Sequence, residues 1–135
     1  MNNAVYTALY SRLQGTALTA LLAGTTSIYH MQAPEGAVLP YVIFSQAGGG
    51  YTPETPHTDA NDVIYVRGYA ESAATAGSIA TQIRTLLDRS PLSVTGWNNS
   101  WFAAEAPHIE LPETDASGKT IFGAGDHYRL RIDKT

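Results

Sequence analysis

The sequence contains no cysteine. Disulfide bonds, thiolate nucleophiles and cysteine-ligated zinc sites are therefore all excluded. A chain of 135 residues without cysteine is typical of a protein made in a reducing compartment, and its stability must come from a hydrophobic core.

Charge is also scarce, and basic charge most of all. Charged residues make up 15% of the chain, where about a quarter is usual. Eight Lys and Arg stand against 12 Asp and Glu, which gives a formal net charge of −4. A protein that grips duplex DNA normally has a clear basic excess, so we do not expect specific DNA binding. A small domain with so few charges is expected to bury part of its surface against partners.

Long hydrophobic runs are missing as well. No apolar run approaches the roughly 18 residues that a membrane-spanning helix needs. The opening residues, MNNAVYTALYSRLQ, lack the basic and long apolar stretches of a signal peptide. We therefore expect no membrane partner and no secretion signal. The hydrophobic content of 44% predicts a single globular domain over residues 1–135.

The first part of the chain predicts two helices and a strand. Val5, Leu9 and Leu13 recur four residues apart, as one face of a helix requires. A shorter helical segment is expected over residues 16–24. Residues 39–45 (LPYVIFS) are rich in aromatic and β-branched residues and lie between turn-forming residues, so they predict a strand covered on both faces.

Residues 47–62 (AGGGYTPETPHTDAND) have neither a helical nor a strand pattern. Segments of this length without regular structure are uncommon inside compact domains and are usually functional or disordered. We expect a long flexible loop here. Two interpretations stay open: a plain connection between two strands, or an arm that becomes ordered against a neighbouring subunit.

Residues 63–70 (VIYVRGYA) predict a strand with two different faces. Tyr65, Arg67 and Tyr69 share one face with Val63, and that face suits a surface or an interface. The residues between them are smaller and apolar, which suits close packing beneath a helix.

A helix is expected directly after this strand, with Ser72 as its N-cap and Ser90-Pro91 as its end. Residues 97–109 predict another strand. A strand pattern resumes at Ile121, passes a Gly-Ala-Gly step that we interpret as a bulge, and continues over residues 128–132 with a charged outer face. The expected fold is α+β: an antiparallel sheet of about four strands with two main helices packed on one face and a long flexible loop.

The motifs that could carry chemistry are weak. Gly118-Lys119-Thr120 ends like a phosphate-binding loop, but Glu113 occupies the position of its first glycine and no helix is expected to follow. A hairpin turn is the better interpretation. Arg129, Arg131 and Lys134 form a small basic strip with Lys119 on the last hairpin, diluted by nearby aspartates.

Four histidines, at positions 30, 57, 108 and 127, are scattered along the chain. His57 with Asp59 and His108 with Glu110 would each share one face of a strand, but a metal site needs further ligands that no local cluster supplies. Neither a G-x-S-x-G elbow nor a triad pattern is present. We therefore expect no catalytic residue, no cofactor and no metal, and we do not expect an enzyme.

Several segments in sequence order resemble one known family. They are ALYSRLQG, LTALLAG, LPYVIFSQ, VIYVRGYA running straight into an alanine-rich helix, and LLDRSPL. Together they resemble the tail completion, or tail terminator, proteins of long-tailed bacteriophages and gene transfer agents. The resemblance spans nearly the whole chain, with LPYVIF and the strand-to-helix junction as its most specific parts.

The resemblance implies a virion structural protein of the tail or neck, assembled in the cytoplasm of the host bacterium. Such a protein forms a homo-oligomeric ring, expected to be a hexamer, that caps the head-proximal end of the tail tube, terminates its polymerisation and joins it to the head. The implied partners are further copies of the chain, the tail tube protein and a head-side neck or connector protein. DNA would pass through the ring without specific binding.

With this resemblance, the segment after the first predicted strand becomes the candidate assembly loop and interface. Its residues are Gly48, Gly49, Gly50, Tyr51, Thr52, Pro53, Glu54, Thr55, Pro56 and His57. Glu54, Asp59 and Asp62 are candidates for an acidic lumen that keeps passing DNA from adhering. Two alternatives remain: another head–tail connector, such as a head-completion or stopper protein, or a small ligand-binding domain or enzyme.

Overall fold

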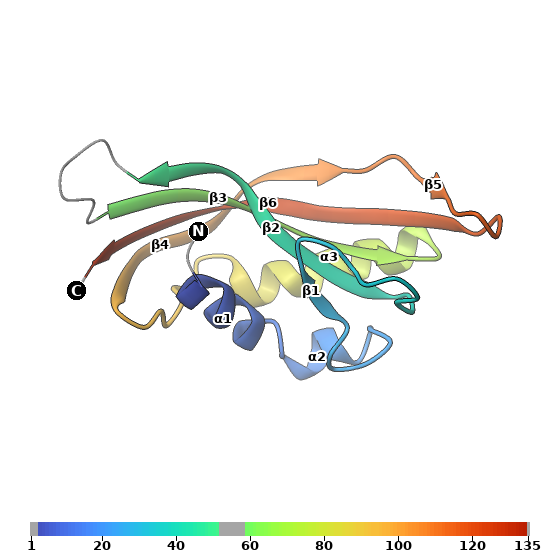
Figure 1. The fold of residues 1–135 in the computed structure, drawn as a ribbon, viewed down its shortest axis with the longest axis horizontal. Coiled ribbons are helices and arrows are strands. Elements are labelled where there is room, and N and C mark those ends of the chain that lie inside the picture. Colours follow the sequence, from blue (N-terminus) through green and yellow to red (C-terminus); the bar gives the residue numbers. More distant parts are fainter. Residues whose placement is uncertain (1–2, 52–58, 135) are drawn as a thin grey trace.

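The computed structural model describes residues 3–51 and 59–134 (Figure 1). Most of its regular structure is strand. The helices are α1 (Asn3–Arg12), α2 (Thr16–Thr19) and α3 (Ala73–Leu87). The strands are β1 (Ile28–His30), β2 (Tyr41–Tyr51), β3 (Asp59–Ala70), β4 (Trp97–Ile109), β5 (Glu113–Thr114) and β6 (Thr120–Lys134).

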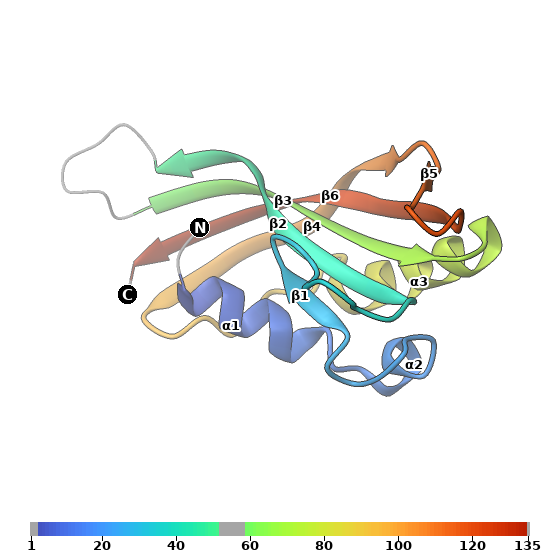
Figure 2. The same ribbon diagram turned by 45° about the vertical axis from the view of Figure 1, so that its right-hand side comes forward.

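The strands form one mixed sheet with the order β1-β2-β3-β6-β4, and the short β5 pairs with β6. β1 runs parallel to β2, whereas the other neighbours are antiparallel. The helices lie together on one side of this sheet (Figures 1 and 2). In the described part of the chain no helix lies on the other side, so the sheet has one helix face and one open face.

The expected sheet of about four antiparallel strands with two main helices is therefore wrong. The fold is mostly sheet, with six strands in a mixed arrangement and three helices. β1 escaped prediction because three residues are too short to show a period of two. The pairing of β1 with β2 is also a long-range event, since Ile28 lies opposite Val42.

The expected long loop is wrong at both of its ends. β2 continues through the glycines to Tyr51, and β3 begins at Asp59, with Gly49 opposite Asp62 and Gly50 opposite Asn61. Backbone pairing does not require a particular side-chain pattern, so a glycine-rich and polar stretch can join a ladder that its long neighbours impose. Residues 52–58 lie outside the described residues.

Bulges also fall elsewhere than expected. β6 crosses its Gly-Ala-Gly step as one continuous strand in regular register with β3. Register shifts occur instead between Gln46 and Gly48 in β2 and at two points in β4. The second of these, between Ala104 and Ala106, puts Ala106 directly opposite His127. Ala106 therefore lies on the open face with Ala103, and not with Phe102 as simple alternation predicts.

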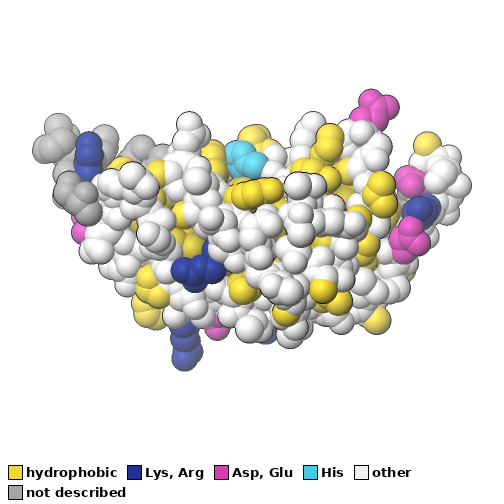
Figure 3. Space-filling model, turned by 90° about the horizontal axis from the view of Figure 1, so that it is seen from below, with side chains coloured by type: hydrophobic (Ala, Val, Ile, Leu, Met, Phe, Trp, Pro, Cys, Tyr) yellow, Lys and Arg dark blue, Asp and Glu magenta, His cyan; other side chains and the backbone are white. Residues whose placement is uncertain are grey.

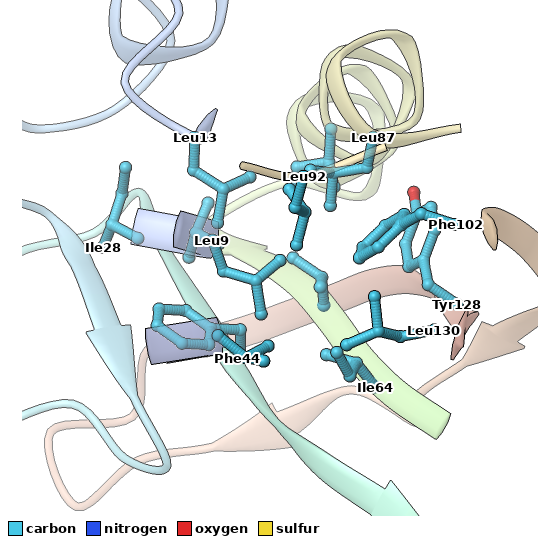
Figure 4. Close-up of a cluster of buried hydrophobic side chains, with 14 of the residues drawn as sticks. Leu9, Leu13, Ile28, Phe44, Ile64, Leu87, Leu92, Phe102, Tyr128 and Leu130 are labelled. Atoms are coloured by element: carbon cyan, nitrogen blue, oxygen red, sulfur yellow. The ribbon is translucent and has the colours of Figure 1, made fainter. Parts of the chain in front are cut away.

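The core lies between the helices and the sheet and confirms the predicted periodicities. Val5, Leu9 and Leu13 are fully buried. Side chains from both helical and strand elements converge there in Figure 4, with Phe44, Phe102, Tyr128 and Leu130 contributed by β2, β4 and β6. α3 lies on β3 and β6. The predicted N-cap is confirmed, because the Ser72 hydroxyl accepts the backbone N–H of Thr75 at 3.2 Å.

A salt bridge and a set of hydrogen bonds hold α3 in place. Arg84 forms a two-pronged salt bridge with Asp126 of β6, at 2.6 and 3.2 Å, and the Asp126 side chain is only 3% exposed. Arg12 of α1 donates to the carbonyl oxygen of Leu86, in the last turn of α3, and to those of Ser90 and Pro91 just beyond its end. Figure 3 views this helix side, where charged side chains are few and hydrophobic ones are scattered. None of the described helices is long and apolar enough to cross a membrane.

Candidate assembly surface

The open face of the sheet carries a group of polar and aromatic side chains contributed by several strands. Alternate residues of β3 are buried against the helices, and the residues between them point to the open face. Tyr65 lies opposite His127 and Ser45, and Tyr69 lies opposite Gly123 and Tyr41. The predicted Tyr/Arg face of β3 therefore forms the middle of this surface.

A hydrogen-bonded cluster centred on Glu110 organises one half of the open face. Glu110 Oε1 accepts the hydroxyl of Tyr65 at 3.0 Å and the hydroxyl of Tyr69 at 2.9 Å. Arg67 donates to Tyr69 Oη at 3.1 Å and to Ser45 Oγ at 2.7 Å. Its guanidinium also lies 4.6 Å from the centre of the Tyr65 ring. Side chains from β2, β3 and the end of β4 are thus fixed in one arrangement.

Burial raises the pKa of both tyrosines in this cluster. Hydrogen bonding to the Glu110 carboxylate adds to the effect for Tyr65, whose pKa rises well above its usual range. The pKa of Tyr69 rises to about 12, since the effect of burial, reinforced by Glu110, exceeds the opposing effect of Arg67. Both hydroxyls therefore stay protonated at neutral pH and act as donors to Glu110.

Two glycines of β6 make room for this cluster. A Cβ at position 123 would lie 2.6 Å from Glu110 Oε2 and 2.8 Å from the Tyr69 ring. A Cβ at position 125 would collide with the backbone of Val66 and Arg67. The glycines thus let side chains of β3 and β4 meet across the intervening strand.

Two of the four histidines belong to the open face. Tyr65 has His127 stacked at 4.8 Å and His108 edge-on at 4.7 Å, and the two imidazoles lie 5.3 Å apart. His108 and Glu110 do share a face, but the Glu110 carboxylate is engaged by tyrosines. Among the described residues no group of three or more His, Asp or Glu is placed to hold a metal ion. His57, of the other predicted pair, lies outside the described residues.

The other half of the open face is organised by an ion pair. Arg129 of β6 makes two contacts with Glu105, at 2.7 and 3.0 Å, and also donates to Asn61 Oδ1 at 3.1 Å. The hydrogen bond from Arg129 holds the pKa of Glu105 below its usual range. Trp101 lies opposite Arg131 in the register and is 50% exposed.

The candidate assembly loop is described only at its start. Gly48, Gly49, Gly50 and Tyr51 form the end of β2. Gly49 has φ +84°, and a side chain there would collide with the backbone of Asn61, so this position requires glycine. The remaining candidates lie outside the described residues; they are Thr52, Pro53, Glu54, Thr55, Pro56 and His57.

The structure places the three candidate lumen acids in different situations. Asp59 begins β3 and lies opposite Asp133. Asp62 is only 2% exposed and accepts a hydrogen bond from Gln46 Nε2 at 3.2 Å. Burial raises the pKa of Asp62. Asp62 is therefore not a surface acid, Glu54 lies outside the described residues, and the acidic lumen stays a prediction.

The prediction from the sequence missed Glu110 and the two glycines as members of this surface. The signal was present, because Gly123 and Gly125 are two residues apart in a predicted strand and mark a place where other side chains approach closely. Their partners on β3 and β4 follow only from the register, which the sequence alone does not supply.

This chain belongs to the tail completion protein gp17 family, whose model it matches over residues 7–116. Its fold is similar to a chain in the virion of a native gene transfer agent particle, with 16% identity, a TM-score of 0.70, and 94% of this chain and 92% of that chain covered. It is also similar to the bacteriophage SPP1 gp17 protein, with 18% identity, a TM-score of 0.51, and 98% and 89% covered. No curated protein sequence matches it.

The family match confirms the resemblance found in the sequence. The protein is a tail completion protein, a structural component of the neck and tail region of a phage-like virion particle. The two solved structures share its fold at low sequence identity.

Proposed function

We propose that this tail completion protein forms a homo-oligomeric ring, most simply a hexamer, at the head-proximal end of the tail tube. The ring ends polymerisation of the tube and offers its other side to the neck proteins of the head. The protein does this without catalysis, and it joins the particle in the cytoplasm of the host bacterium. The observation that carries the proposal is the family match over residues 7–116.

The surface chemistry supports a role in assembly. Charged residues are only 15% of the chain, and few appear on the helix side (Figure 3). The open face combines Tyr, Trp and Arg, which are residues that contribute strongly to protein–protein interfaces. A ring subunit needs two such contact surfaces, one for each neighbour.

In the ring, we place the hairpin of β2 and β3 at the contacts with neighbouring proteins and Asp59 with Glu54 at the channel. Carboxylates there would repel the phosphates of passing DNA, so the DNA would move without specific binding. Reversing both charges, Glu54→Lys with Asp59→Lys, is expected to slow DNA ejection while particles still assemble. An unchanged rate of ejection would contradict the placement of these two residues at the channel.

The role in tail completion is tested by deleting the reading frame from its source genome and examining the particles by electron microscopy. We expect filled heads without tails beside free tubes of irregular or excessive length. A complementing copy of the gene should restore particles with tails of uniform length.

Two other outcomes would change the assignment. Heads that lose DNA while free tails keep a normal length would make the protein a head-side connector, such as a completion or stopper protein. Particles with normal tails would contradict any assembly role. In that case a small ligand-binding domain or an enzyme would become the better hypothesis.

A further inference from the structure

Two hollows lie at opposite ends of the open face. The first, which we call the acidic hollow, has a volume of about 530 Å³, and its lining includes Tyr41, Tyr69, Glu110, Leu111 and Glu113. The second, the arginine hollow, has a volume of about 490 Å³, and its lining includes Asn61, Trp101, Glu105, Arg129 and Arg131.

The two hollows are well separated along the same strands. A Cβ at Gly123 would touch the Glu110 carboxylate, which places the acidic hollow beside that part of β6. Arg131 lies eight residues further along β6, a distance of about 26 Å along the strand. A single copy therefore cannot bring these two ends together.

The acidic hollow combines unneutralised carboxylates with exposed apolar surface. Glu113 is exposed, and among the described residues no Lys or Arg forms an ion pair with Glu110 or Glu113. Glu110 Oε1 accepts hydrogen bonds from the hydroxyls of Tyr65 and Tyr69. Leu111 is 85% exposed and adds apolar surface to the lining of this hollow.

The arginine hollow has the opposite character. Arg129 is neutralised by Glu105, whereas Arg131 is exposed and makes no ion pair in the described part of the chain. Trp101 lies beside Arg131 and is half exposed. Asp59 and Asp133 lie two residues beyond Arg131 on the same face, where they line a further hollow together with Arg131 and Asn61.

We propose that copies of this chain associate head to tail, with Trp101 and Arg131 of one copy seated in the acidic hollow of the next. Arg131 then faces Glu113, and Trp101 covers Leu111 and the Tyr41–Tyr69 pair. The proposal rests on the ring described above and names its subunit contact. A head-to-tail contact uses two different surfaces of each copy, and such contacts form a ring when the rotation between neighbouring copies closes.

The absence of cysteine allows a direct test. Glu113→Cys and Arg131→Cys are prepared separately in the full chain, and the two variants are treated with a short bis-maleimide, each alone and then mixed. We expect a cross-linked dimer at least tenfold more abundant in the mixture than with either variant alone. Glu35→Cys, an exposed acid between β1 and β2, replaces Glu113→Cys in the control mixture and should yield no more than either variant alone.

Each other outcome overturns a distinct part of the proposal. Dimers from one variant alone would show a two-fold contact instead of a head-to-tail one. Wild-type rings in electron micrographs, without cross-linking of the mixture above the control, would leave the ring standing and remove this contact from it. If wild-type protein formed no rings at any concentration, and none were present in purified tails, the ring itself would be wrong. Cross-linking to the tube protein in purified tails would assign the hollows to that partner.

A charge exchange provides a second and independent readout. Arg131→Glu and Glu113→Arg should each reduce oligomer formation at least tenfold by mass photometry, since each places like charges opposite each other. The double variant, which restores opposite charges, should recover most of it. Circular dichroism should show all three variants folded, because both residues are exposed. Failure of the double variant to recover, with folding intact, would contradict the pairing.

Discussion

Strand β3 contributes to both faces of the sheet, and its two sets of side chains are held by different forces. Ile64, Val66 and Ala70 are fully buried against the helices. Tyr65 and Tyr69, one residue away, are half-buried and held by hydrogen bonds to Glu110, more than 40 residues further along the chain. The side chains of the helix face are thus held by apolar packing. Those of the open face are held by hydrogen bonds between residues that the strand register brings together. We expect the first to control stability and the second to control assembly.

The largest effect should follow from deleting apolar volume on the helix face. Leu130→Ala is expected to lower the free energy of unfolding by about 3 kcal/mol, because Leu130 is fully buried. Its neighbour Arg131 points to the open face, and Arg131→Ala should cost less than about 0.5 kcal/mol. Urea denaturation of both variants measures the difference. Similar losses of unfolding free energy in the two variants would contradict the expectation that the helix face controls stability.

A side chain added to β6 tests how tightly the open face is packed. Gly125→Ala should destabilise the protein by about 2 kcal/mol, because its Cβ meets the backbone of Val66 and Arg67, which cannot yield. Gly77→Ala serves as the control, since nothing lies within 4 Å of its Cβ. That variant should gain about 1 kcal/mol, since alanine favours helix over glycine. Thermal denaturation should show shifts of opposite sign.

Single hydrogen bonds of the Glu110 cluster should contribute less. Tyr69→Phe removes one of the two donors to Glu110 Oε1 and should cost about 1 kcal/mol in chemical denaturation. Tyr10→Phe, at a largely exposed tyrosine of α1, is the matched control and should change stability little. If Tyr69→Phe lowered the free energy of unfolding no more than Tyr10→Phe, the Glu110 cluster would not stabilise the folded subunit.

The two faces should also respond to pH with opposite sign. Burial raises the pKa of Asp62, so the folded protein binds its proton more tightly than the unfolded chain, and the contribution of Asp62 to stability falls as pH rises above the usual aspartate range. Asp62→Asn should therefore become more stable relative to wild type as pH rises above the usual aspartate pKa of about 4 and through the raised pKa of Asp62. Glu105, whose pKa Arg129 lowers, behaves in the opposite way.

The control for that measurement is Glu105→Gln. The advantage of wild type over this variant should be present at neutral pH and disappear as pH falls through the lowered pKa of Glu105. Unfolding free energies measured across the same pH series for both variants give the two slopes. Slopes of the same sign would contradict the assignment of Asp62 to a buried site and Glu105 to an ion pair.

Prediction from the sequence succeeded where local pattern was sufficient. The helical spacing of Val5, Leu9 and Leu13 and the alternation in residues 63–70 each describe one element and the face it buries, and both were confirmed. The Ser72 cap was likewise a local signal. Prediction failed for β1 and for the glycine-rich end of β2, because their strand structure is imposed by neighbours rather than by their own side chains.

The candidate site was harder to predict for the same reason. The sequence drew attention to residues 47–62 by composition, and the structure describes residues 47–51 and 59–62 of that segment. It named the Tyr/Arg face of β3 but not Glu110, which reaches that face across β6. It noted the basic strip on β6, yet only the tertiary structure shows that Arg129 pairs with Glu105 while Arg131 is exposed and forms no ion pair with any described residue.

By itself the sequence determined the family, the burying faces of α1, α3 and β3, and a surface poor in charge, since these depend on residue types and on spacing within one element. Only the tertiary structure decided the sheet order, the burial of Asp62 and the placement of Glu110 and Arg131 at opposite ends of the open face. Those features depend on the register between strands distant in sequence. The alternation within one strand fixes which of its side chains are buried, but it does not say which residues of a distant strand lie opposite them.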